Sequence, residues 1–244
     1  MLVYNARTVV LIDAGVSAKR ICDGLKSLGF APTDLSGICI THSHSDHISG
    51  LRILLKRTNA AVYTCCATAN TLRKQVDGIE GRIEVVEPLT PFSIGDLEVT
   101  PFPTSHDAPG SAGFSITDGV RKCSVVTDLG FVTEDVRHCV LGSQLALVEA
   151  NHDPEWLMSG PYPYYLKQRI LGDGGHLSNE DSGELCCELA ASGTSKLVLA
   201  HLSRENNTPE RARNVVCDML ARRGFDHISV TVAPCDHVAA PIEV

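Results

Sequence analysis

The sequence has 244 residues, of which 43% are hydrophobic and 20% are charged. This composition is typical of a globular protein with a sizeable core, and it excludes a disordered, collagen-like or low-complexity chain. The net charge of −8 excludes a protein that coats nucleic acid through a broadly basic surface, but it is compatible with an enzyme that binds a nucleic acid end at a local site.

The sequence shows no signal for a membrane or an export route. No stretch reaches the roughly eighteen consecutive apolar residues of a membrane span, and the N-terminus has no basic segment followed by a long apolar one. The ten cysteines include two adjacent pairs and no CxxC motif. Without a leader we interpret them as reduced thiols, not as a disulfide framework, and we expect a cytoplasmic protein.

The predicted elements alternate between strands and helices. Apolar runs end first at an Asp-Ala-Gly turn and then at a histidine-rich loop, a helical pattern follows over Ile48–Lys56, and β-rich runs separated by Pro and Gly turns fill the middle. The predicted strands are Thr8–Ile12, Gly37–Thr41, Ala61–Thr64, Ile83–Glu87, Leu97–Phe102, Gly113–Thr117, Lys122–Thr127, Leu145–Glu149 and Lys196–Ala200. Capping residues predict two later helices, which begin after Ser178 and after Thr208.

No internal repeat and no linker-like stretch divides the sequence, so we predict one domain over residues 1–244. The alternating pattern predicts an α/β fold of mixed sheets with helices on the outer faces, arranged as a four-layer αββα sandwich.

The strongest chemical signal is a loop after the second predicted strand, where residues 41–47 read THSHSDH. His42 and His44 occupy alternate positions of an extended segment, so their side chains point the same way and can close on one metal. Asp46 and His47 come where the chain turns, and they can face a second metal nearby. Imidazole and carboxylate donors suit Zn, Mn or Fe, and the absence of thiolate argues against a purely structural zinc site.

This HxHxDH loop resembles the signature of the metallo-β-lactamase fold superfamily. The resemblance implies further metal ligands at the ends of later strands. The implied set is His42, His44 and His106 for one metal, Asp46, His47 and His201 for a second, and Asp128 as the bridge. Asp13, in the Asp-Ala-Gly turn, matches a position that orients a loop histidine, and Glu149 is a further candidate for orienting a ligand.

Several later segments resemble the YycJ/WalJ family of this superfamily, bacterial enzymes associated with 5′-to-3′ exonuclease activity. They are SHDA at 105–108, TDLG at 127–130, EANHD at 149–153, GPYP at 160–163, GHLSN at 175–179 and HLS at 201–203. Family members usually begin with an additional strand and a small polar loop, whereas this sequence begins with MLVY. We therefore expect that strand to be absent and one sheet edge to be bare.

The resemblance implies a dinuclear metal-dependent phosphodiesterase, a 5′-to-3′ DNA exonuclease in which a metal-bridging hydroxide is the nucleophile and Asp46 orients it. His176 follows two glycines, and we assign it to phosphate binding or to protonation of the leaving oxygen. Ser178 and Asn179 open a helix and are assigned to substrate binding. The two divalent ions are Zn or Mn, DNA is the expected substrate with RNA as the other option, and the oligomeric state is undetermined.

Two features and two functions stay open at this stage. Residues 161–165 hold three of the five tyrosines, followed by Lys167 and Arg169. They form either a stacking platform with phosphate-steering cations or a loop whose tyrosines pack on the core, and we favour the core. His152 is an equally open candidate. The other functions are hydrolysis of small thioesters or lactones, as in glyoxalase II-type enzymes with the same loop, and a non-catalytic metal-bearing partner in a cell-envelope or replication pathway.

Overall fold

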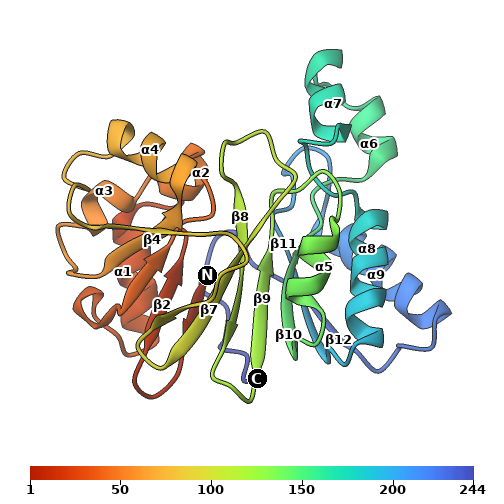
Figure 1. Cartoon of the computed structure of the whole chain (residues 1–244). Helices are drawn as coiled ribbons and strands as arrows, with labels where there is room; N and C mark the ends of the chain where they lie inside the picture. Colours follow the sequence, from red (N-terminus) through yellow and green to blue (C-terminus); the bar gives the residue numbers. More distant parts are fainter. The chain divides into compact units, whose positions relative to one another are not determined.

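The computed structural model describes all 244 residues, and the chain divides into two compact units (Figure 1). The first unit comprises Met1–Pro101 and Ala108–Ala112, and the second comprises Phe102–Asp107 and Gly113–Val244. Each contains strands, helices and an apolar cluster of its own, so the predicted α/β class is confirmed. The prediction of a single domain stays a prediction. No helix has both the length and the apolar character that crossing a membrane requires.

A five-stranded sheet forms the centre of the first unit, in the order β1-β2-β3-β4-β5. Its strands are β1 (Leu2–Tyr4), β2 (Val9–Ile12), β3 (Gly37–Cys39), β4 (Ala61–Cys65) and β5 (Ile83–Val86). β1 is antiparallel to β2, and the other neighbours are parallel. The edge of β2, which we expected to be bare, is therefore paired, and the Met1 amino group also donates to the Ile12 carbonyl at 2.6 Å.

Short helices and a hairpin complete the first unit. They are α1 (Ala18–Ser27), the 3₁₀ helix η1 (Pro32–Asp34), α2 (Ser45–Ile48), α3 (Leu51–Leu54), α4 (Cys66–Gln75) and the antiparallel pair β6 (Phe92–Ile94) and β7 (Leu97–Pro103). The helix predicted over Ile48–Lys56 is present in shorter form as α3, and α2 before it was not predicted. Gly50 lies between them, and its N–H donates to the Ala14 carbonyl at 2.8 Å, which turns the chain away from a straight helix.

The second unit has strands in the order β12-β11-β10-β9-β8, with β8 antiparallel to β9 and the others parallel. They are β8 (Ala112–Thr117), β9 (Lys122–Val126), β10 (Leu145–Glu149), β11 (Lys196–Ala200) and β12 (Ser229–Val232). Its helices are α5 (Glu134–Val140), α6 (Pro154–Ser159), α7 (Tyr164–Leu171), α8 (Asn179–Ala191) and α9 (Pro209–Arg222). α5, α8 and α9 pack against the strands, whereas α6 and α7 project beyond the strand ends (Figure 1).

The parallel strands of the second unit determine where its polar residues meet. Val126, Val148 and Leu199 of β9, β10 and β11 are fully buried in one apolar cluster with α8 and α9. Because these three strands are parallel neighbours, their carboxyl ends lie at one edge of the sheet. The residues that follow them are therefore brought together, as expected for ligand sites in α/β proteins.

Candidate metal centre

The histidine-rich loop of the first unit connects β3 to α2. His42 is fully buried and His47 is buried, whereas the side chain of Asp46, in the first turn of α2, is 66% exposed. The ring centroids of His42 and His44 are 4.6 Å apart, and those of His42 and His47 are 4.0 Å apart. The structure thus brings the loop histidines together, and the donor atoms of Asp46 and His47 also lie within 4.8 Å of each other.

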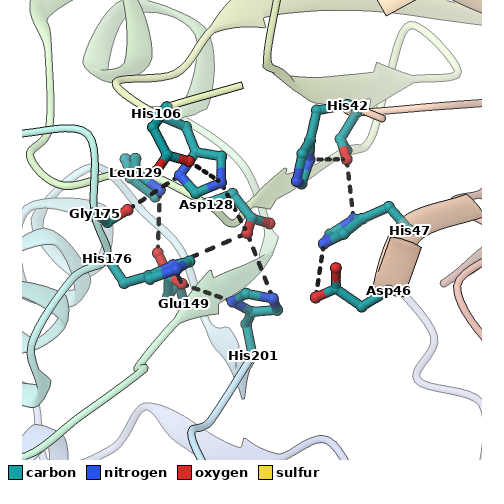
Figure 2. Close-up of polar contacts among 12 residues, drawn as sticks. His42, Asp46, His47, His106, Asp128, Leu129, Glu149, Gly175, His176 and His201 are labelled. Atoms are coloured by element: carbon teal, nitrogen blue, oxygen red, sulfur yellow. Dashed lines mark hydrogen bonds and ion pairs between the residues drawn. The ribbon is translucent and has the colours of Figure 1, made fainter. Parts of the chain in front are cut away.

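Asp13 holds this loop from the end of β2. One carboxylate oxygen accepts the Thr41 N–H, and the other accepts the Thr41 hydroxyl and lies 2.8 Å from His47 Nδ1. Burial alone would raise the pKa of Asp13, but the neighbouring His47 and the hydrogen bonds lower it below its ordinary value. Asp13 is therefore a carboxylate that accepts the His47 Nδ1–H, and the lone pair of His47 stays on Nε2, 3.7 Å from Asp46 Oδ2 (Figure 2).

Two glycines beside this loop were missed by the sequence reasoning. A Cβ on Gly15 would lie 1.5 Å from the Asp46 carbonyl oxygen, and one on Gly50 would lie 2.1 Å from the Val16 carbonyl oxygen. The Ala14 N–H also donates to the His47 carbonyl at 2.8 Å. The Asp-Ala-Gly turn is therefore a backbone clamp, meaning that its main chain packs against and hydrogen bonds to the main chain of the loop. The glycine of that turn is the sequence signal from which this close contact could have been predicted.

In the second unit, three neighbouring parallel strands supply polar residues to one sheet edge. Asp128 follows β9, Glu149 ends β10 and His201 follows β11 (Figure 2). Asp128 is 2% exposed, and its Oδ1 lies 3.4 Å from His201 Nε2. With His176, these residues form a group whose donor atoms all lie within 4.8 Å of one another, close enough to share a metal ion.

Glu149 organises this group. Its carboxylate is fully buried, and Oε1 lies 2.7 Å from the Nδ1 atoms of both His176 and His201. Oε2 accepts the N–H groups of Leu129 and Leu177 at 3.2 and 3.3 Å. Burial alone would raise the pKa of Glu149, but the hydrogen bonds and charges of the two histidines lower it well below its ordinary value. One carboxylate therefore orients two imidazoles (Figure 2).

His106 joins the same group from the segment after β7. Its Nδ1 lies 3.2 Å from the Gly175 carbonyl, and its Nε2 lies 3.8 Å from Asp128 Oδ1. Burial lowers the pKa of His106 against the opposing effect of Asp128. The neutral ring is the form that binds a metal, and donation from Nδ1 to Gly175 leaves the lone pair on Nε2.

The loop before α8 carries the predicted substrate residues. His176 is partly exposed, and its N–H donates to the Ile170 carbonyl at 3.0 Å. Ser178 is the N-cap of α8 and accepts the Asp181 N–H, whereas Asn179 is fully buried and its side chain hydrogen bonds to Asn207. The side chains of Ser178 and Asn179 are thus engaged within the protein, and their contact with a substrate stays a prediction.

His152 lies apart from these groups. Its side chain is buried with neither ring nitrogen hydrogen bonded, and burial lowers its pKa to about 4. The structure therefore gives it the properties of a neutral core histidine.

Three candidate residues share an uncommon backbone conformation. Four non-glycine residues have a positive φ, and three of these lie one or two residues after a strand: Asp13 at 60°, Asp128 at 62° and His201 at 57°. Asp is among the residues that adopt this region most readily, yet it is still strained relative to an extended chain. At each of these positions the left-handed conformation ends the extended course of the strand.

Comparison with known proteins decides the family. The model of the beta-lactamase superfamily domain matches residues 8–202. The chain belongs to this superfamily. Within it, the chain is 35% identical over 217 residues to the exodeoxyribonuclease YycJ of Bacillus anthracis, covering 88% of this chain and 82% of the relative. It is 36% identical over 223 residues to the exodeoxyribonuclease WalJ of Streptococcus pneumoniae R6, covering 89% and 82%. The chain is thus a member of the YycJ/WalJ family of metallo-hydrolases.

Solved structures of the superfamily confirm the metallo-β-lactamase fold. Zinc-bound PqqB from Methylobacterium extorquens matches with a TM-score of 0.72 at 16% identity, covering 100% of this chain and 86% of that one. The metallo-β-lactamase fold protein YhfI from Bacillus subtilis matches with a TM-score of 0.70 at 18% identity, covering 95% and 87%. The fold predicted from the HxHxDH loop is confirmed.

The residues of each unit suit a divalent metal ion. His47 and His201 each face a carboxylate through Nδ1, which fixes the tautomer and leaves Nε2 as the donor. The donor set is nitrogen and carboxylate oxygen, which suits Zn or Mn. The chemistry of the donors therefore fits the metal that the superfamily implies.

Proposed function

We propose that this chain is a metal-dependent phosphodiesterase that removes nucleotides from the 5′ end of DNA in the cytoplasm. The observation that carries the proposal is the pair of carboxylate–imidazole contacts, Asp13 with His47 and Glu149 with His201, which prepare metal-binding nitrogens. The choice of DNA is supported by the YycJ/WalJ relatives, which are named exodeoxyribonucleases, and the choice of the 5′ end follows the family resemblance of the sequence.

The proposed ligands of two divalent ions are those that the sequence implied. They are His42, His44, Asp46 and His47 of the first unit and His106, Asp128 and His201 of the second. When bound, two ions of Zn or Mn supply an acidified water molecule and neutralise charge on the phosphodiester. Asp46 is the exposed carboxylate of this set, and it orients the attacking water by accepting a hydrogen bond.

His176 is proposed to supply the proton that the leaving oxygen requires, and Glu149 orients His176. Because His176 Nδ1 donates to Glu149, its Nε2 is the atom that faces a substrate. The Glu149 carboxylate thereby holds the imidazole ring in one orientation. His176 Nε2 therefore donates a proton to the leaving oxygen, or a hydrogen bond to a phosphate oxygen.

The test is hydrolysis of a 5′-labelled DNA duplex with Mn²⁺ by the parental protein, by Asp46→Ala and by Asp23→Ala. Asp23 is an exposed aspartate of α1 and serves as the matched control. We expect stepwise release of nucleotides from the 5′ end by the parental protein and the control, and none by Asp46→Ala, with all three equally folded. Full activity of Asp46→Ala refutes the mechanism. A fully metallated parental protein that cleaves neither DNA nor RNA but hydrolyses a thioester refutes the nuclease assignment.

A second variant pair tests the proton donor. His176→Gln should lower turnover by roughly 10²- to 10⁴-fold, the range of general acid–base catalysis, while metal content is unchanged. His227→Gln, at an exposed histidine outside the cluster, should match the parental protein. Loss of a metal ion from His176→Gln would instead make this residue a ligand.

A further inference from the structure

The helical hairpin of α6 and α7, residues 154–171, presents aromatic side chains to solvent. Tyr164 is 69% exposed and Tyr165 is 75% exposed, at the start of α7. The sequence reasoning favoured packing of these tyrosines on the core, and for Tyr164 and Tyr165 this is wrong, because a side chain so exposed has no core contact of that kind. Two adjacent exposed tyrosines on a projecting helix therefore need another explanation (Figure 1).

The hairpin is held rigidly. The buried Lys167 ammonium group donates to the Met158 and Gly160 carbonyls at 2.6 and 2.8 Å, which ties α7 to the C-terminal end of α6. Pro161 and Pro163 restrict the connection further. Lys167 is thus a structural cation, and the interpretation of it as a phosphate-steering residue is wrong. A rigid support lowers the entropic cost of binding at the two tyrosines.

Of the other two aromatic residues of the hairpin, Tyr162 is half-buried and Trp156 is covered on one face. The guanidinium of Arg211 lies over the Trp156 ring, 4.5 Å from its centroid, and Arg211 also contacts Asp153, the N-cap of α6. A cation on a ring face occupies the surface that a nucleobase would use. Tyr164 and Tyr165 are therefore the most exposed aromatic side chains of the hairpin.

The hairpin is connected directly to the cluster around Glu149. Arg169 of α7 forms an ion pair with Asp107, the neighbour of His106, and the Ile170 carbonyl accepts the His176 N–H. Tyr165 precedes Ile170 by five residues, or about 7.5 Å along a helix at about 1.5 Å per residue. Successive nucleotides of a strand rise by about 3.4 Å. A strand with a phosphate at His176 would have a base near the tyrosines within a few nucleotides.

The segment that carries the two tyrosines has no carboxylate, and its two cations are engaged by the Met158 and Gly160 carbonyls and by Asp107. Residues 160–172 contain one lysine, one arginine and no carboxylate, in a chain whose net charge is −8. Aromatic faces without nearby carboxylates are typical of surfaces that stack nucleobases without sequence preference.

We propose that Tyr164 and Tyr165 form a stacking surface for the bases of single-stranded DNA next to the cleaved phosphate. The proposal rests on the proposed nuclease function, since it extends that site to the neighbouring nucleotides. It assigns to the hairpin the binding of bases that have separated from their partners at a DNA end, because paired bases within a duplex offer no free face to the tyrosines.

The experiment compares the double variant Tyr164→Ala/Tyr165→Ala with Tyr164→Phe/Tyr165→Phe and with Leu171→Ala, an exposed apolar residue of the same helix. Binding of a fluorescent phosphorothioate oligothymidylate is measured by anisotropy. The alanine pair should weaken binding by roughly 5- to 100-fold, the range for loss of stacking on one base, and the other two variants should match the parental protein. Hydrolysis of the dinucleotide thymidylyl-thymidine, too short to reach the tyrosines, should be the same in all four proteins.

Three outcomes overturn the proposal or separate it from the nuclease function. Parental affinity of the alanine pair for the oligothymidylate overturns the stacking surface. A change from dimer to monomer in light scattering, caused by the alanine pair, overturns it in favour of an interface between copies. If the parental protein cleaves no nucleic acid, the proposed function fails, and the stacking surface is still decided by the binding measurement.

Discussion

Replacement of Glu149 by glutamine removes one buried charge without changing the shape of the side chain. Oε1 faces two imidazole Nδ1 atoms at 2.7 Å, and Oε2 accepts two backbone N–H groups at 3.2 and 3.3 Å. A glutamine amide has one carbonyl oxygen, and its NH₂ group is only a donor. Whichever way the amide turns, one pair of donors loses its acceptor.

The expected loss of stability in Glu149→Gln follows from these four hydrogen bonds. Bonds to a charged group contribute about 1.5–3 kcal/mol each and neutral bonds about 0.5–1.5 kcal/mol, and a buried donor without an acceptor costs about 1–3 kcal/mol. Against this loss, the amide avoids the burial cost of a carboxylate, which is several kcal/mol. We expect Glu149→Gln to lower the free energy of unfolding by about 2–4 kcal/mol.

The assay is urea unfolding of the metal-free protein, followed by circular dichroism, together with a Mn²⁺ titration. Glu184→Gln is the control, because Glu184 pairs with Arg223 at the surface and such pairs contribute about 0–1 kcal/mol. Because Glu149 orients His201, the metal affinity of Glu149→Gln should fall by about 10- to 100-fold. A variant as stable as the control, with parental metal affinity, would refute the argument that Glu149 organises this group.

Other predictions follow from the loop, the metal and the core. Gly15→Ala should weaken Mn²⁺ binding at least about tenfold in a titration, because its Cβ would lie 1.5 Å from the Asp46 carbonyl oxygen; parental affinity would contradict the clamp. Saturating Mn²⁺ should raise the melting temperature of the parental protein, because a ligand at a hundred times its Kd stabilises the folded state by about 2.7 kcal/mol, and it should raise that of Asp13→Asn less; equal shifts would contradict the role of Asp13. Leu185→Ala, at a buried core position, should cost about 2–5 kcal/mol in urea unfolding, whereas Val120→Ala, at a residue 85% exposed, should change stability by less than about 0.5 kcal/mol. Similar stabilities for these two variants would contradict the assigned core.

The fold class and the loop could be predicted because their signals are local. The HxHxDH pattern occupies six consecutive residues, and apolar runs such as Leu145–Glu149 coincide with β10 as the structure has it. β1, β6 and β12 were not predicted, since each has only three or four residues, several of them partly exposed. Short strands of this kind carry little apolar periodicity.

The contacts that organise the candidate site could not be predicted, because they depend on pairing between distant parts of the chain. Nothing near Glu149 in the sequence shows that one oxygen faces two histidines 27 and 52 residues away. The clamp at Gly15 depends on how closely the Asp46 backbone approaches. Lys167 resembles a surface cation in sequence, and only the folded hairpin shows its ammonium group at two carbonyls.

The left-handed backbone at Asp128 and His201 affects which substitutions are favoured as the sequences of this family evolve. Glycine adopts such a conformation without strain, so replacing either residue by glycine relaxes the metal-free chain while it deletes a proposed ligand. Selection for stability alone therefore favours loss of the site, in line with the general trade-off between activity and stability. Descendants that have lost catalysis and kept the fold should show glycine at these two positions.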